Sequence, residues 1–360
     1  MTTLIFLLPF LVVYAVFAIY AERKISAFIQ DRLGPMEVGY YGIGQTVADL
    51  VKLLQKEDII PANAQKAFFR VAPIVIFVSV FAGFSVLPLS PSWSGAALSS
   101  GLFFLLAIIS LDVIGIMLAG WSSNNKYSML GTIRSAAQLI SYEVPLGLAV
   151  LAVCIFAQTL DLQEISFQQG ILSSEPRYFM DVPAWNIRVD QIGGIFAWNI
   201  FRMPLLFFTW VIFFIASLAE CNRAPFDLPE AESELIAGFH TEYSGFRFAV
   251  IMLGEYAMML LVSILGVVLF FGGWNTPLPD IGPVSLASWT TGTPGTVAAS
   301  LWGIFWLMSK SLLFVAVQMW IRWTYPRLRI DQLMALSWKY LTPFALILIV
   351  VFAFWKILFV

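Results

Sequence analysis

Apolar runs constrain the fold of this chain more than any other feature of its 360 residues. Eight such runs each extend over about 20 residues or more, which is the helix length that crosses the ~30 Å hydrocarbon layer of a bilayer. Hydrophobic residues make up 60% of the sequence and charged residues only 12%. The sequence therefore predicts an all-α, polytopic membrane protein with a single membrane domain over residues 1–360. The predicted spans are 3–22, 68–89, 101–121, 135–159, 200–219, 245–271, 296–321 and 336–358.

The basic residues predict the orientation of these spans. Fifteen of the 20 Lys and Arg residues follow odd-numbered spans, and loops rich in Lys and Arg stay in the cytoplasm. The loops 23–67 and 220–244 are therefore expected to be cytoplasmic, the segment 160–199 is expected to be a long external surface loop, and both termini are expected outside. The first apolar run has no positive region before it and no small-residue cleavage site, so we interpret it as a retained helix and not as a signal peptide.

The first cytoplasmic loop contains an amphipathic pattern. Its apolar residues recur at helical spacing, opposite a polar face that carries Asp49 and Lys52. The pattern predicts a helix that lies on the membrane surface or against a partner subunit. The apolar positions are Ile43, Val47, Leu50, Val51 and Leu54.

Ionisable residues inside apolar runs are costly, and by default they indicate function. A buried group that can bind and release a proton suits a proton relay, whereas a paired structural charge is the alternative. We expect relay roles first for Glu143 and Glu220, then for Glu255, and both interpretations stay open for Asp112 and Lys310.

The cytoplasmic stretch "AECNRAPFDLPEAESELIAGFHTEY" (219–243) concentrates acid between two spans. Glu230, Glu232 and Glu234 are too close in sequence to ionise independently. Apolar residues on both sides and the turn-forming Pro225 and Pro229 favour a folded-in segment at membrane depth over an ordinary solvated loop.

Composition also limits the chemistry of the chain. Two cysteines, Cys154 and Cys221, are too few to hold an iron–sulfur cluster or a structural zinc, and the single His240 excludes a His-rich metal site. No basic patch or nucleic-acid motif is present. The chain itself is therefore expected to hold no metal.

Several stretches together resemble one known family. They are "AERKISAFIQDRLGP" (21–35), "ADLVKLLQKED" (48–58), "GWSSNNKYSMLGTIRSAAQLISYEVPL" (120–146) and "RWTYPRLRIDQLMALSWKYLTP" (322–343). The combination is similar to the quinone-site membrane subunit of respiratory complex I, the H-subunit or ND1 family of proton-pumping NADH:quinone oxidoreductases. The resemblance covers most of the chain.

The resemblance implies a role in a larger translocase. A member of this family forms a quinone-access tunnel with its neighbours and helps to couple quinone reduction to proton translocation. The substrate would be ubiquinone or menaquinone, and FMN and the iron–sulfur clusters would belong to partner subunits. The implied partners are the cluster-bearing and quinone-site hydrophilic subunits, the antiporter-like and small membrane subunits, and lipid, in a bacterial inner membrane with periplasmic termini.

The resemblance also implies roles for individual residues. It places seven residues at or near the quinone tunnel: Glu22, Arg23, Arg32, Asp49, Arg223, Phe226 and Arg322. It places seven acids on the proton path: Glu143, Glu220, Asp227, Glu230, Glu232, Glu242 and Glu255. Asp112, Lys310 and the 160–199 loop have no role that the resemblance assigns.

Three other functions compete with this interpretation. The homologous membrane subunit of a proton-pumping hydrogenase shares the fold and several acids, but the complete first-loop motif and the dense "PEAESE" favour the quinone branch. A stand-alone transporter would be expected to show inverted repeats with broken helices, which the sequence lacks. A purely structural anchor leaves the intramembrane acids without explanation.

Overall fold

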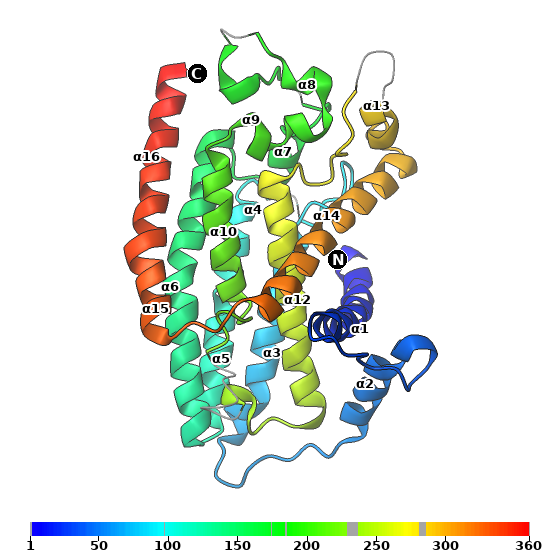
Figure 1. Cartoon of the computed structure of the whole chain (residues 1–360), viewed down its shortest axis with the longest axis vertical. Coiled ribbons are helices and arrows are strands. Elements are labelled where there is room, and N and C mark those ends of the chain that lie inside the picture. Colours follow the sequence, from blue (N-terminus) through cyan, green and yellow to red (C-terminus); the bar gives the residue numbers. More distant parts are fainter. Residues whose placement is uncertain are drawn as a thin grey trace.

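The structure is a computed structural model, and it describes residues 2–96, 98–173, 175–183, 186–228, 237–280 and 286–359. Helices are the regular elements throughout these ranges, and the long ones run side by side along the longest axis of the molecule (Figure 1). The α-helices are α1 (Thr2–Ile29), α2 (Gln45–Gln55), α3 (Lys66–Gly83), α4 (Gly101–Ile109), α5 (Leu111–Ser122), α6 (Lys126–Ala157), α7 (Leu162–Phe167), α8 (Val189–Ile192), α9 (Asn199–Arg202), α10 (Leu206–Glu220), α12 (Gly245–Phe270), α13 (Leu286–Thr291), α14 (Val297–Thr324), α15 (Ile330–Ala335) and α16 (Thr342–Phe359). Short 3-10 turns are η1 (Tyr40–Gly42), η2 (Phe84–Val86), η3 (Phe179–Asp181), η5 (Gly194–Ala197) and η6 (Gly238–His240), and η7 (Leu336–Leu341) is a π-helical turn that joins α15 to α16.

The all-helical membrane architecture is confirmed. Within the described residues, six helices are long and apolar enough to cross a membrane. They are Lys66–Val86, Gly101–Ser122, Lys126–Ala157, Gly245–Phe270, Val297–Thr324 and Ile330–Phe359. The 28-residue α1 covers the first apolar run, and the shorter α10 covers most of the fifth. That α1 and α10 also cross the membrane stays a prediction.

The fifth apolar run is not one continuous helix. It begins as the single turn α9, and the chain then leaves the helix at Met203–Leu205, where Pro204 cannot donate a backbone hydrogen bond. Helix α10 has 15 residues and rises about 22 Å at 1.5 Å per residue. Helix α10 by itself is therefore shorter than the ~30 Å hydrocarbon layer, and its last residue, Glu220, is buried in the protein.

Helix α12 forms the centre of the bundle. Every residue from Tyr256 to Phe270 is buried, as expected for a helix that is apolar on all sides. It packs against α1, α3, α10 and α14. In Figure 1, α12 runs beside α10, the tilted α14 crosses it, and α1 lies to one side.

Two glycines allow helices α3, α5 and α12 to pack closely together near Asp112 and Glu255. A Cβ atom on Gly115 of α5 would lie 2.6 Å from Ile76 Cγ1 of α3, and one on Gly254 of α12 would lie 3.2 Å from Ile76 Cγ2. Larger residues would push these helices apart. The close approach therefore holds Asp112, three residues before Gly115, near Glu255, the residue after Gly254.

The amphipathic helix of the first loop is present as α2. Its partly buried face packs against α1 and α12, whereas Ile43, Val47, Val51 and Leu54 on its apolar stripe are exposed. An exposed apolar face is expected where a helix meets lipid or a partner subunit.

The segment 160–199 differs from the expected surface loop. It folds into the short elements α7, η3, α8 and η5, and parts of it are buried, including Ile165, Gln169 and Asp181. The amide of Gln169 explains part of this burial, because it donates to the Val268 carbonyl of α12 (2.8 Å) and accepts from the backbone of Asn199 (3.1 Å). Side-chain hydrogen bonds to the bundle thus fold a polar segment inward.

Candidate functional site

A buried carboxylate at the end of the first helix anchors the site. Glu22 of α1 is only 6% exposed. It accepts a hydrogen bond from Tyr256 Oη of α12 at 2.6 Å and forms an ion pair with Arg322 of α14. The Arg223 guanidinium lies 3.7 Å away and stacks over the Tyr256 ring. Three segments far apart in sequence therefore converge on Glu22.

Arg223 joins this carboxylate to a second one. Its Nη2 atom lies 3.8 Å from Glu255 Oε2 on α12, and Glu255 Oε1 lies 3.0 Å from His240 Nε2 of η6. The cluster thus pairs two acids, Glu22 and Glu255, with two guanidinium groups, those of Arg223 and Arg322. Buried charges are tolerated when they are paired in this way. Removal of one member would leave its partner as an unpaired buried charge, which is strongly destabilising.

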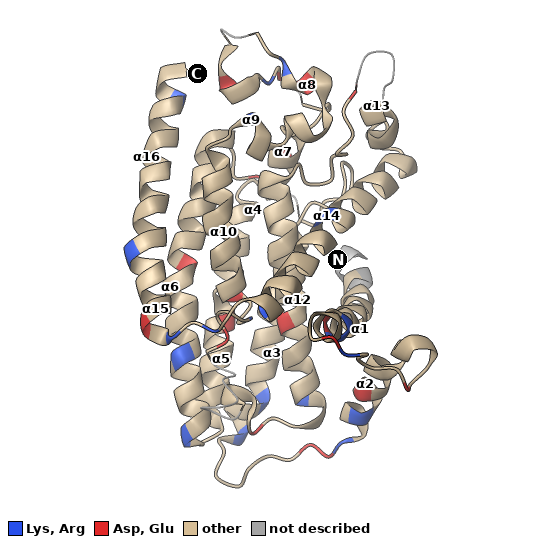
Figure 2. Cartoon of the chain, viewed as in Figure 1, with Lys and Arg blue, Asp and Glu red and all other residues tan. Residues whose placement is uncertain are grey.

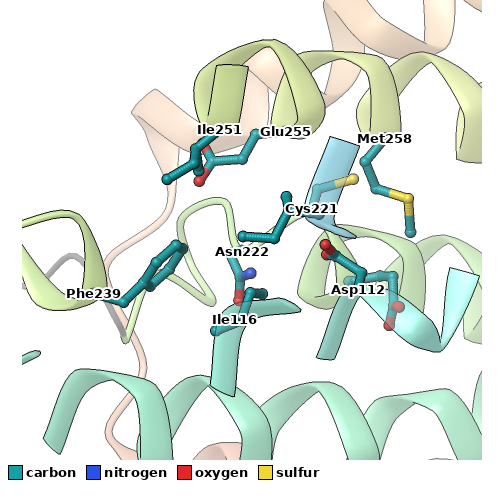
Figure 3. Close-up of a pocket in the computed structure, with 10 residues that line it drawn as sticks. Asp112, Ile116, Cys221, Asn222, Phe239, Ile251, Glu255 and Met258 are labelled. Atoms are coloured by element: carbon teal, nitrogen blue, oxygen red, sulfur yellow. The ribbon is translucent and has the colours of Figure 1, made fainter. Parts of the chain in front are cut away.

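A small internal cavity continues the site beyond Glu255 (Figure 3). Its volume is about 10 Å³, close to what one water molecule needs. Asp112 of α5, Glu220 at the end of α10 and Glu255 of α12 all line it, with Cys221 and Asn222 between them along the wall. Three helices, α5, α10 and α12, therefore each bring one carboxyl group to this cavity.

Glu143 lies beside this group and not inside the cavity. It is half-buried on α6, and its charge interacts with that of Glu220. Asp112 interacts in the same way with Glu255. An electrostatic series thus runs from Glu22 through Arg223, Glu255 and the cavity to Glu143.

The acidic loop does not bring all its acids together. Asp227 forms an ion pair with Arg327 (3.0 Å), and Phe226 packs edge-on against Tyr142 with ring centroids 5.3 Å apart. Glu242 accepts from Asn125 (2.6 Å) at the end of the bundle where α6 begins, away from the cavity. Glu230, Glu232 and Glu234 lie outside the described residues.

The charged residues of the first loop form a separate surface. Arg23 and Arg32 line a hollow of about 330 Å³ with Gly34 and Pro35. Arg23 Nη1 lies 2.5 Å from Asp49 Oδ2 of α2. Partial burial raises the pKa of Asp49, but the hydrogen bonds from Arg23 and Gln45 outweigh it and bring this pKa below its ordinary value. Asp49 is therefore charged throughout the physiological pH range, and it holds Arg23 at the rim of the hollow.

Three residues of the site were underrated from the sequence. Tyr256 is not among the expected site residues, His240 enters the sequence analysis only as the single histidine, and Asp112 stays open there between a relay and a structural charge. Only Asp112 carried a usable signal, an acid inside an apolar run. Tyr256 and His240 gain their importance from contact with Glu22 and Glu255, which no spacing in the sequence reveals.

Metal-ligating side chains are not grouped around these acids in the part of the chain that the structure describes. No group of three or more His, Cys, Asp or Glu side chains there is arranged to hold a metal ion. Cys154 and Cys221 are both buried as free thiols. The arrangement instead suits proton exchange among carboxyl groups and recognition of a polar head group.

Comparison with known proteins gives one consistent result. A family model described as NADH dehydrogenase matches residues 1–353. A protein of Cytophaga hutchinsonii, named as an H subunit of NADH-quinone oxidoreductase, is 58% identical, over 99% of this chain and 99% of that protein. Proteins of the same name from Chlorobium luteolum and Brevibacillus brevis are 51% and 42% identical, over 97% and 95% of this chain and 87% and 88% of theirs.

Proposed function

The chain belongs to the H-subunit family of NADH-quinone oxidoreductases, and on that premise we propose that it forms a quinone-access tunnel with neighbouring subunits and links quinone reduction to proton translocation. It is a multi-pass membrane subunit of an oxidoreductase complex. The relatives named as subunits of that complex support other subunits of it as partners. FMN and the iron–sulfur clusters are proposed to lie in those partners.

The series of buried ionisable groups from Glu22 to Glu143 is the observation that carries this proposal. One end, at Glu22, Arg223 and Arg322, lies beside the charged first loop. The other end passes through the cavity between α5, α10 and α12 into the bundle. A redox event at the first end can thus alter proton affinity at the second without a proton crossing open lipid.

Simple electrostatics gives the size of such an effect. Quinone reduction by two electrons requires two protons, and any delay in their arrival leaves negative charge in the site. A unit charge 10 Å away at an effective dielectric constant near 20 contributes about 1.7 kcal/mol. That energy exceeds the ~1.4 kcal/mol that changes a protonation equilibrium tenfold. Each carboxyl group in the series can pass the effect to the next by changing its own charge.

The quinone side of the proposal rests on the first loop and its neighbours. Arg23 and Arg32 border the 330 Å³ hollow and offer hydrogen-bond donors to a quinone head group. Asp49 fixes Arg23. Phe226 does not line this hollow but is buried against Tyr142, so its proposed place in the tunnel wall rests on the family resemblance alone. The proposed substrate is ubiquinone or menaquinone, and partner subunits would complete the tunnel.

Carboxyl-to-amide variants test the proton path. Glu220→Gln and Glu143→Gln keep the shape of the side chain but cannot carry a proton as an acid. In assembled complex, we expect each to lower quinone-linked turnover and proton pumping at least about tenfold, because a positioned proton-transfer group typically contributes about 10²–10⁴-fold. Glu164→Gln, in α7 outside the series, serves as the matched control. Normal pumping by both assembled path variants would refute the proposal.

Arg23→Ala tests the quinone side separately. The substitution removes a half-exposed side chain whose ion pair with Asp49 contributes little to stability, about 0–1 kcal/mol. We therefore expect normal assembly and a higher KM for quinone. A KM for quinone equal to that of the parent enzyme would show that Arg23 is not part of the quinone tunnel.

A further inference from the structure

Two carboxyl oxygens at the internal cavity lack any hydrogen-bond partner among the described residues. They are Asp112 Oδ1 and Glu220 Oε2. Asp112 is 8% exposed and Glu220 is 5% exposed, so bulk water does not supply the missing partner. Buried polar atoms are almost always hydrogen-bonded, by protein or by an ordered water molecule. We therefore expect both oxygens to be hydrogen-bonded to a ligand inside the cavity.

The cavity has the size and the chemistry for one water molecule. Its ~10 Å³ is about the room that a single water molecule requires. A buried water molecule needs two to four polar partners, and Asp112, Glu220, Asn222 and Glu255 all line this space (Figure 3). Larger ligands do not fit, and a purely apolar cavity would stay empty.

We infer that an ordered water molecule in this cavity bridges Asp112 and Glu220 and makes them a proton-sharing pair, with Asp112 as an additional proton-carrying residue of the path. The inference deepens the proposed function and rests on it. A proton leaves the carboxyl group of one acid for the water molecule, and a second proton leaves the water molecule for the carboxylate of the other. One proton has then moved between the acids, and the water molecule is unchanged.

The position of the pair indicates which groups this proton exchange would connect. Asp112 interacts with Glu255, which is joined through Arg223 to Glu22, whereas Glu220 interacts with Glu143. The water molecule would thus close the gap between the half of the series nearer the first loop and the half inside the bundle. Two ionised carboxylates around one buried cavity would repel each other and lose most of their hydration, so sharing a proton lowers the electrostatic cost.

A density map of the intact complex tests the water molecule directly. We expect a peak within hydrogen-bonding distance of both Asp112 Oδ1 and Glu220 Oε2, at a resolution that shows ordered water elsewhere in the bundle. An empty cavity in such a map overturns the inference. The map uses the parent protein, so the test does not depend on the folding of any variant.

Variants in the assembled complex test the proton-sharing pair. We expect Asp112→Asn to lower pumping about tenfold or more, as for Glu220→Gln, because each removes one partner of the same transfer. The double variant should be no worse than either single variant, since residues that act as a unit are not additive. Glu164→Gln, in α7 and outside the cavity, should leave pumping unchanged.

Infrared difference spectra separate proton transfer from a merely structural role. Reduction of the complex should change a carboxylic-acid C=O band that disappears in both Asp112→Asn and Glu220→Gln but persists in Glu164→Gln. If Glu220→Gln impairs pumping and Asp112→Asn does not, the inference fails and the proposed function stands. If neither variant impairs pumping, the proposed proton path itself fails.

Discussion

At the scale of single residues, Lys310 shows how a buried charge can be structural. Its Nζ atom donates to the backbone carbonyls of Phe271 (2.7 Å) and Asn275 (2.9 Å), and it lies 4.7 Å from the centroid of the Trp198 ring. These carbonyls follow the last turn of α12, where helices leave acceptors without partners and favour a cation. Of the two roles that the sequence left open, the geometry favours a cap on α12 over a proton relay.

Variants of Lys310 distinguish these roles. Lys310→Met leaves two buried carbonyl groups without their donor, and we expect a loss of about 1–3 kcal/mol in the stability of the assembled complex. Lys310→Arg retains a donor and should restore part of that loss. Thermal unfolding in detergent measures both. Pumping per assembled complex should stay near the parent rate, whereas loss of pumping in a normally stable Lys310→Met complex would assign Lys310 to the path instead.

At the scale of elements, one buried ion triad ties three helical ends together. Asp181 of η3 lies 2.5 Å from Arg202 of α9 and 2.6 Å from Lys356 of α16, and the Phe156 ring of α6 lies beneath both cations. Arg202 is only 1% exposed. The triad therefore fastens the last turns of α16 to the 160–199 segment, far from the site.

Asp181→Ala should lower the thermal stability of the complex more than Lys356→Met does. The first change leaves two cations, one of them wholly buried, without their acid, and uncompensated burial costs about 3–5 kcal/mol. The second change leaves the Arg202–Asp181 pair intact and replaces the lysine by an apolar chain of similar length. Thermal unfolding of the complex should rank the variants in this order. Equal melting temperatures for Asp181→Ala and the parent would show that the triad does not stabilise the protein.

At the scale of the whole molecule, the charge distribution predicts how the protein lies in the membrane. Figure 2 shows Lys and Arg gathered over the half of the molecule where α3, α6 and α12 begin and where α2 lies. The opposite end, with α8, α13 and the end of α16, carries few. Because basic residues stay on the cytoplasmic side, we propose that the α2 end faces the cytoplasm and that both termini lie outside.

Single cysteines at the two ends test this orientation. We expect Lys126→Cys, at the start of α6, to react with a membrane-impermeant maleimide only in inside-out vesicles. Glu175→Cys, whose parent side chain is 71% exposed in the 160–199 segment, should react only from the outer side of intact cells. The native Cys154 and Cys221 are buried and provide a low background. The reverse labelling pattern would invert the topology.

Several parts of the site could be predicted from the sequence, and others could not. Glu143, Glu220 and Glu255 were identifiable because an acid in an apolar run is costly and rare. Asp227 and Glu242 were predicted with them, yet the first pairs with Arg327 and the second with Asn125. Sequence proximity in one loop did not decide which acids share a cluster, because the loop turns between them and different helices supply their partners.

The sequence alone determined the helical membrane architecture, the amphipathic α2 and the family, because hydrophobic period, run length and motif are properties of local stretches. Tertiary structure alone decided that Glu22, Arg223, Tyr256 and Arg322 meet, and that Asp112 and Glu220 face one cavity. Those contacts join residues up to 300 positions apart. Close packing of α3, α5 and α12 at Gly115 and Gly254 also brings Asp112 near Glu255, and the volume of a side chain limits packing only once the helices are assembled.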